Sequence, residues 1–251
     1  MARGVPSSLE RLHQLCGERS TDPLMCVLTL LFLRALHDGD EWIRLRDYEP
    51  ERFVGQGEHV LSLIRLCFPH HFEHDDQLSV RLHELNHGRP TGSLVELTDK
   101  TYLALKQLPD DGDVLGAAYM FLLPKRQADW NGEFYTPWSL ALTLAKMNPP
   151  APGETVHDPA CGSGRLLWAA LEACREQHGE EAATTVRLYG VEINPRMAQI
   201  ARLNSILHGC GNQTLIATAD ALAGPAFLTR DGEPAQFDVI TANPPFGTRR
   251  R

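Results

Sequence analysis

The chain has 251 residues, of which 43% are hydrophobic and 22% are charged, and its net charge at pH 7 is −8. These values are typical of a globular protein with one large or two modest domains, and they exclude a disordered chain. The negative charge disfavours a protein that holds DNA by itself, because neutralisation of phosphates supplies most of the non-specific affinity for DNA. Binding to DNA would require a local basic groove or a partner.

The cysteine pattern and the apolar segments indicate a cytoplasmic protein. Six cysteines are scattered without a C-x-x-C pair, which favours reduced thiols over a disulfide framework or a zinc ribbon. The N-terminus does not have the basic and apolar layout of a signal peptide. The most apolar stretch, residues 24–33, is far shorter than the roughly 20 residues of a membrane span. We expect a buried helix there.

Residues 1–128 are predicted to form a helical domain. In segment 21–39, Asp22 is a candidate N-cap, Pro23 occupies the first helical position and Gly39 can end the helix. Apolar residues recur at threes and fours in further segments, as expected for helices with one buried face. These segments are 58–68, 76–87, 93–108 and 111–123.

From about residue 129 the pattern changes to alternating strands and helices. Strands are predicted at the start of 154–164 and within 185–193, 213–221 and 237–245, and helices at 165–179 and 195–209. This alternation predicts an α/β fold with a parallel sheet and helices on its faces. Ligands of such sheets bind at the carboxyl ends of the strands, and each motif described below falls at such an end.

The segment Asp158–Gly164 follows the first predicted strand and contains two glycines. Gly162 and Gly164 permit backbone angles and a close approach that a Cβ atom would prevent. Ser163 and the helix start at Arg165 provide N–H groups that point into the turn. The segment fits a ligand-binding turn, and a plain connection between a strand and a helix has the same composition.

Acidic residues end the second and third predicted strands. Glu192 is placed to bind the two hydroxyl groups of a ribose, as in dinucleotide-binding folds, or it is a solvated acid at a helix start next to Pro195. Asp220 can accept a hydrogen bond from an adenine amino group, or it is an N-cap. The residues alone leave both alternatives open.

The most specific signal is Asn243-Pro244-Pro245-Phe246, directly after the fourth predicted strand. The amino nitrogen of a base is a poor nucleophile, because its lone pair is conjugated into the ring. The Asn243 side-chain oxygen and the Pro244 carbonyl can each accept one N–H of such an amine, which would localise the lone pair and direct it at an electrophilic methyl group. The prolines keep these acceptors rigid, and Phe246 offers a face on which an extruded base can stack. The alternative is a proline-rich turn after an edge strand.

Four sequence blocks carry a resemblance to a known family. The blocks are "GEFYTP" at 132–137, "DPACGSG" at 158–164, "YGVEINP" at 189–195 and "ANPPFG" at 242–247. In order and spacing the chain resembles the modification subunit of type I restriction–modification systems, which methylates adenine N6 in DNA. Segments 30–38 and 113–123 also resemble the N-terminal helical region of that family, so the resemblance spans nearly the whole chain.

The resemblance implies a fold, a cofactor and a set of site residues. It implies a Rossmann-like class I methyltransferase domain at residues 129–251 that binds S-adenosylmethionine and acts on DNA. The methionine end of the cofactor would be covered by Phe134, Tyr135 and Thr136, and the cofactor turn would be shaped by Asp158, Ala160, Gly162 and Gly164. Glu192 would hold the ribose and Asp220 the adenine. The target base would be held by Asn243, Pro244, Pro245 and Phe246. Direct attack on the sulfonium methyl needs no covalent intermediate, so we expect Cys161 to be a packing residue.

The resemblance also implies parts that this sequence does not supply. The family fold has seven strands and the sequence accounts for four, so we expect a methyltransferase domain truncated after the fourth strand. A truncated chain, a naturally split enzyme and a decayed copy all fit, and target recognition would come from a separate specificity subunit. Two alternatives stay open: a cofactor-binding chain that needs a partner for catalysis, and a methyltransferase that acts on RNA or on protein glutamine, because an Asn-Pro-Pro loop with an aromatic residue also serves those substrates.

A second pattern, H-E-L-N-H at residues 83–87, matches the H-E-x-x-H motif of zinc hydrolases. Gly88 and Pro90 follow at once, and no third ligand presents itself downstream. We therefore expect a chance match and no metal site.

Overall fold

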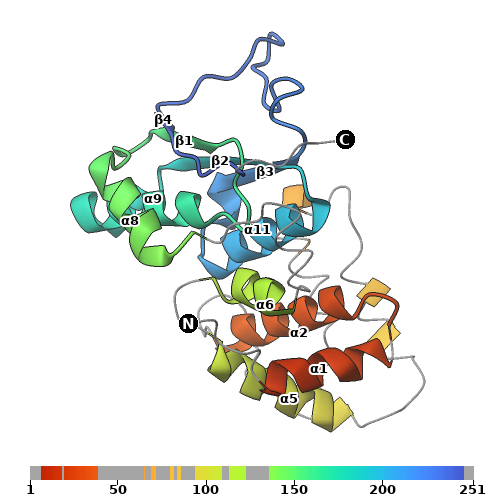
Figure 1. Cartoon of the computed structure of the whole chain (residues 1–251). Helices are drawn as coiled ribbons and strands as arrows, with labels where there is room; N and C mark the ends of the chain where they lie inside the picture. The colour runs from red at the N-terminus through yellow and green to blue at the C-terminus, as the bar shows by residue number, and fades with distance from the viewer. Residues whose placement is uncertain are drawn as a thin grey trace. The chain divides into compact units, whose positions relative to one another are not determined.

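The computed structural model describes residues 7–18, 20–38, 65, 69–71, 80–81, 84–85, 94–108, 113–122 and 136–245. The chain divides into two compact units, Met1–Leu123 and Pro124–Arg251 (Figure 1). The predicted boundary between residues 128 and 129 lies outside the described residues and stays a prediction.

The described part of the first unit is helical. Its elements are α1 (Ser7–Gly17), α2 (Pro23–Asp38), the 3₁₀ helix η2 (Pro69–His71), α5 (Leu94–Gln107) and α6 (Val114–Leu122). Helix α1 packs against α2 and α5, and α2 packs against α5 and α6. Their core contains the fully buried side chains Leu9, Leu12, Leu15, Leu28, Leu30, Leu31 and Phe32. The predicted helices at 21–39, 93–108 and 111–123 are confirmed, α1 was not predicted, and most of 58–68 and 76–87 lies outside the described residues.

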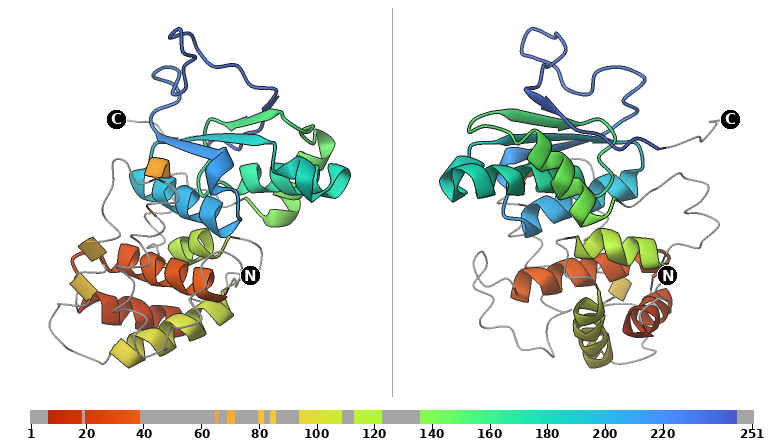
Figure 2. Two further views of the ribbon diagram at one scale, coloured as in Figure 1. Left: turned by 180° about the vertical axis from the view of Figure 1, so that it is seen from behind. Right: turned by 60° about the vertical axis from the view of Figure 1, so that its left-hand side comes forward.

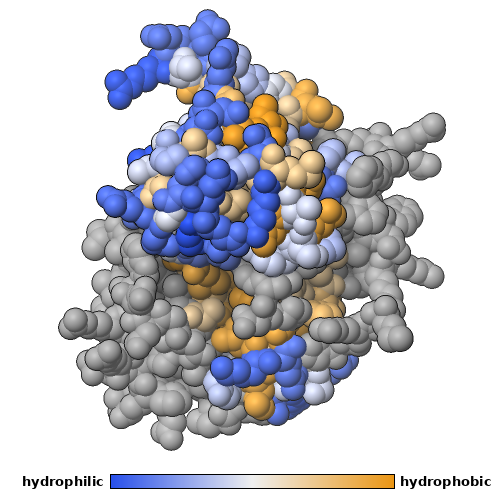
Figure 3. Space-filling view, turned by 90° about the vertical axis from the view of Figure 1, so that its left-hand side faces the viewer, coloured by the Kyte–Doolittle hydropathy of each residue, from blue (hydrophilic) through white to orange (hydrophobic). Residues whose placement is uncertain are grey.

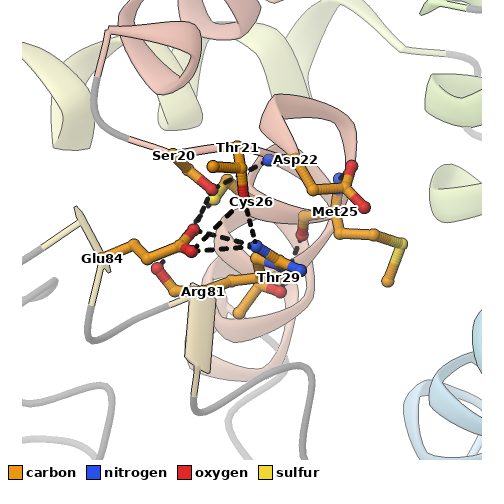
Figure 4. A network of polar contacts seen from close by, with 8 residues as sticks. All are labelled: Ser20, Thr21, Asp22, Met25, Cys26, Thr29, Arg81 and Glu84. Carbon is orange, nitrogen blue, oxygen red and sulfur yellow. Dashed lines mark hydrogen bonds and ion pairs between the residues drawn. The ribbon is translucent and has the colours of Figure 1, made fainter.

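Helix α2 begins at a polar network (Figure 4). The Asp22 carboxylate accepts a hydrogen bond from the Met25 N–H at 3.3 Å, which confirms the predicted N-cap. Ser20, just before the helix, donates to Glu84, and Glu84 pairs with Arg81 at 3.0 Å.

Within the described residues, no helix has both the length and the hydropathy to cross a membrane.

The second unit contains a parallel sheet of four strands. The strands are β1 (Thr155–Asp158), β2 (Arg187–Glu192), β3 (Thr214–Thr218) and β4 (Val239–Ile240), in the order β3-β2-β1-β4. All three neighbouring pairs are parallel, so the predicted α/β fold with a parallel sheet is confirmed. Strand β4 is shorter than the predicted segment 237–245.

Helices α8 (Trp138–Met147), α9 (Arg165–His178) and α11 (Pro195–Leu207) lie on one face of this sheet (Figures 1 and 2). The short helices α10 (Glu180–Ala183) and η3 (Gly211–Gln213) complete the connections. Helices α9 and α11 were predicted within two residues, and α8 was not predicted.

On the side where α8 and α9 lie, hydrophilic residues gather over much of the surface (Figure 3), and Lys146 of α8 pairs with Glu176 of α9 at 2.6 Å.

The segment between β3 and β4 crosses the other face of the sheet (Figure 2). Phe237 stacks on His157 of β1 with ring centroids 4.4 Å apart, and Phe227 contacts Tyr189 of β2 edge-on at 5.2 Å. The His157 Nδ1 lies 3.2 Å from the Tyr189 carbonyl oxygen. This aromatic cluster covers the middle of the face, whereas Leu215 and Ile240 at its margins are 42% and 67% exposed.

Candidate active site

The carboxyl ends of the four strands meet at one edge of the sheet, because all strands are parallel. Backbone hydrogen bonds extend past the strand ends and join the loops there. The Cys161 N–H donates to the Val191 carbonyl at 2.9 Å, and the Ala219 N–H donates to the Glu192 carbonyl at 3.1 Å. On the other side of β1, the Thr241 N–H donates to the His157 carbonyl at 3.0 Å. The turn after β1 is therefore fixed to the end of β2, and the loops after β3 and β4 start from the same edge.

The turn Asp158–Gly164 is closed by its own hydrogen bonds and by Glu192. The Asp158 carboxylate accepts from the Ala160 N–H at 2.9 Å, and the Gly164 N–H donates to the Cys161 carbonyl at 2.8 Å. The Glu192 Oε2 accepts from the Gly162 N–H at 3.0 Å. The structure thus brings together the glycine turn and the acidic residue of the next strand.

The two glycines of this turn meet different surroundings. Both have a positive φ, 55° for Gly162 and 91° for Gly164. A Cβ atom on Gly164 would lie 2.2 Å from the Trp168 ring, whereas a Cβ atom on Gly162 would meet nothing within 4 Å. Gly164 is therefore required by packing, and Gly162 leaves room for a ligand to approach the backbone.

Two side chains outside the motifs hold the turn from behind. The Ser163 carbonyl accepts from Trp168 Nε1 at 3.2 Å and from Asn204 Nδ2 at 3.1 Å. Trp168 also stacks on His208 of the α11 C-terminus at 5.4 Å. Sequence reasoning missed these residues, and the available signal was a polar Asn204 among apolar positions of the predicted helix 195–209.

The turn places two carboxyl groups near each other. Burial raises the pKa of Asp158 to about 7, the hydrogen bond from the Ala160 N–H opposes this rise, and the charge of Glu192 adds to it. Burial also raises the pKa of the Cys161 thiol well above its usual value. A protonated thiol in the hydrophobic core agrees with the expectation that Cys161 is a packing residue.

Glu192 and Asp220 both accept backbone hydrogen bonds at the sheet edge. Besides Gly162, Glu192 accepts from the Asn194 N–H at 2.7 Å, and Asn194 caps α11 by accepting from the Arg196 N–H at 3.0 Å. Asp220 accepts from the Leu222 N–H at 3.1 Å and so caps a turn and not a helix. The predicted roles of Glu192 toward a ribose and of Asp220 toward adenine stay predictions.

The loop after β4 contacts the segment that precedes α8. The Asn243 Nδ2 donates to the Thr136 hydroxyl at 2.9 Å, which joins the end of β4 to the residues before α8. Pro244 and Pro245 are exposed. Phe134, Tyr135 and Phe246 lie outside the described residues, as do His83 and His87 of the H-E-x-x-H match.

The chain belongs to the N-6 DNA Methylase family, which matches residues 110–250. It is 33% identical over 139 residues to the methylase subunit of the type I restriction enzyme MjaVII from Methanocaldococcus jannaschii, covering 54% of this chain and 22% of that protein. It is 32% identical over 139 residues to the EcoEI methylase subunit from Escherichia coli, covering 53% of this chain and 28% of that protein. The matches therefore span about a quarter of the length of these relatives.

Comparison with solved structures supports the fold described above. A modification subunit from Vibrio vulnificus matches 98% of this chain and 62% of its own length with a TM-score of 0.56 and 18% identity. A type I restriction–modification methyltransferase subunit from Streptococcus thermophilus matches 95% of this chain and 62% of its own length with a TM-score of 0.51 and 20% identity. At these identities the likeness concerns the fold alone.

A matched pair of alanine substitutions tests the division between the two glycines. We expect Gly164→Ala to destabilise the second unit by about 2–5 kcal/mol, because it combines left-handed strain with overlap of the Trp168 ring. Gly162→Ala adds only the strain, about 1–2 kcal/mol. Chemical denaturation measures both, and equal losses of stability would contradict this reading of the turn.

The raised pKa of Asp158 predicts how stability changes with pH. Since its folded-state pKa of about 7 lies above the usual 3.8, the native chain keeps a proton that the unfolded chain releases between about pH 4 and 7. The free energy of unfolding should therefore fall as pH rises through this window, by at most roughly 1.4 kcal/mol per pH unit from this group. Asp158→Asn should remove this part of the slope in urea unfolding at pH 5, 6, 7 and 8. Identical slopes for both proteins would refute the assignment.

Proposed function

We propose that this chain carries the S-adenosylmethionine site and the target-base loop of a DNA adenine-N6 methyltransferase of a restriction–modification system. The observation that carries the proposal is that Asn243 of the Asn-Pro-Pro loop starts from the same sheet edge as the Asp158–Gly164 turn and Glu192. The family match and the methylase subunits among the relatives support it.

The residues at the edge suit this cofactor. Gly162 leaves open space above the turn, and the carboxyl groups of Asp158 and Glu192 suit a ligand that carries a sulfonium and an ammonium group. The residues that would hold it are Phe134, Tyr135, Thr136, Asp158, Ala160, Gly162, Gly164, Glu192 and Asp220. Glu192 would exchange its hydrogen bonds with backbone N–H groups for bonds to the ribose hydroxyls.

Asn243 and Pro244 would activate the target amine. The Asn243 Oδ1 and the Pro244 carbonyl oxygen would accept the two amine hydrogens and so direct the nitrogen lone pair, while Phe246 would stack on the base. When bound, S-adenosylmethionine would supply the electrophilic methyl group and would leave as the neutral thioether. The amine held by Asn243 and Pro244 would accept that methyl group and release one proton to solvent.

A partner would supply target recognition in the cytoplasm. The net charge of −8 opposes independent DNA binding, and a specificity subunit would provide the contacts that select the sequence. Methylation of RNA or of protein glutamine is less well supported, because the family and the named relatives are DNA methylases and type I restriction methylase subunits.

A second candidate function is cofactor binding without catalysis until a partner completes the sheet. The observation that favours it is the short strand β4 at the end of the sheet, where Ile240 is 67% exposed. Calorimetry with S-adenosylmethionine and methyl transfer to DNA, measured on the isolated chain and on the chain with a specificity subunit, separate the two functions. Binding without turnover in both samples favours the second.

The two parts of the site should respond differently to substitution. We expect Asn243→Ala to abolish methyl transfer while S-adenosylmethionine affinity stays nearly unchanged, because in the proposed site Asn243 would contact the target amine and not the cofactor. Glu192→Ala should weaken cofactor binding roughly tenfold or more, the effect of losing hydrogen bonds to a charged group. Calorimetry measures affinity, and radiolabelled methyl transfer to DNA, RNA and protein measures activity. Equal loss of cofactor affinity in both variants would contradict this division.

A further inference from the structure

The hydrogen bond between Asn243 and Thr136 joins the target loop to a segment 107 residues earlier in the chain. Both side chains are partly buried, and their donor and acceptor atoms are 2.9 Å apart. In the part of the chain that the structure describes, this is the one hydrogen bond of the Asn243 side chain. Its amide oxygen therefore accepts nothing there, and its amide nitrogen is held.

The sequence restricts both partners of this bond. Thr136 precedes Pro137 and Asn243 precedes Pro244, and a following proline confines the backbone of the preceding residue to the extended region. Thr136 is also β-branched, which limits its χ1 rotamers. Two stiff residues that meet at hydrogen-bond distance form a preorganised contact, since little conformational freedom is lost in making it.

Such a contact matters because the two ends of a side-chain amide differ in hydrogen bonding: the nitrogen donates and the oxygen accepts. With Oδ1 toward the target, Asn243 accepts an amine hydrogen and leaves the nitrogen lone pair free for attack. With Nδ2 toward the target, the amide would donate to that lone pair or repel the amine hydrogens. Rotation of the amide by 180° thus changes an activating group into an inhibiting one.

We propose that Thr136 is a positioning residue that holds the Asn243 amide with its oxygen toward the target amine. This inference rests on the proposed function and deepens it. Thr136 accepts the Nδ2 hydrogen, so the nitrogen end of the amide is held at Thr136 and the oxygen is the end left to face the target amine. The role differs from the cofactor contact implied by the sequence block "GEFYTP", because it acts through Asn243 and on turnover.

The first experiment observes the amide itself and needs no activity. Selective ¹⁵N-asparagine labelling gives the side-chain NH₂ signals of the chain, and Asn243→Ala identifies the pair that belongs to Asn243. We expect one proton of this pair to be shifted downfield and protected from exchange with solvent. Thr136→Val should remove the shift and the protection, and Thr136→Ser, which keeps the hydroxyl, should restore both.

A matched control comes from the neighbouring helix. Thr143 of α8 is exposed, and its hydroxyl donates to the Ser139 carbonyl at 2.7 Å. Thr143→Val makes the same chemical change on the helix that follows Thr136, where the hydroxyl bonds Ser139 and not Asn243, and it should leave the Asn243 signals and the kinetics unchanged. Unchanged Asn243 signals in Thr136→Val would overturn the inference whatever the activity.

The second experiment separates positioning from cofactor binding. In the chain assembled with a specificity subunit and saturated with S-adenosylmethionine, Thr136→Val should lower kcat about fivefold to tenfold, the effect of losing one neutral hydrogen bond. Saturation removes from kcat any loss of cofactor affinity that the same substitution causes. Thr136→Ser should recover most of kcat.

The outcomes distinguish this inference from the proposed function. A Thr136→Val assembly with wild-type kcat, or one whose loss lies only in cofactor affinity, overturns the positioning role and leaves the methyltransferase standing. A wild-type assembly that transfers no methyl group to DNA overturns the proposed function, and the catalytic meaning of the contact with it, even where the Asn243 signals respond as expected.

Discussion

The site depends on the parallel pairing of β1 with β2. This pairing puts the turn after β1 beside the end of β2, where the Cys161 N–H bonds the Val191 carbonyl and the Gly162 N–H bonds Glu192. The backbone therefore fixes the glycine turn before any cofactor contact exists. Strands β3 and β4 lie on either side of this pair and run in the same direction. The loops that follow the four strands therefore all start at the same edge of the sheet.

The two carboxyl groups at this edge favour the binding of a cation, whereas their mutual repulsion opposes folding of the chain alone. Asp158 is 1% exposed, and Glu192 is near enough to raise its pKa further. Burial of a carboxyl group beside another acid opposes folding when both are ionised. A positively charged ligand near this edge would offset the repulsion and lower the pKa of Asp158. A strained electrostatic arrangement of this kind is common where a protein is built for a ligand and not for maximal stability.

Local patterns predicted much of this fold, and long-range contacts explain what they did not predict. The Asp22 cap of α2, helices α9 and α11, and the parallel sheet follow from caps, glycines and apolar periodicity, which are local signals. Helix α8 escaped prediction because its N-cap, Pro137, makes no side-chain capping bond. The bonds from Asn204 to Ser163 and from Asn243 to Thr136 link residues 41 and 107 positions apart, and no local pattern encodes such distances.

The two halves of the site are held by interactions of different strength. The Asp158–Gly164 turn is anchored by a β1–β2 ladder of four residue pairs and by Trp168 and Asn204 behind it. The loop that begins at Asn243 follows β4, which pairs with β1 through only two residues and is the last strand of the sheet within the described residues. Short edge pairing gives little restraint, so the prolines and the Thr136 contact must supply the rigidity that the ladder does not.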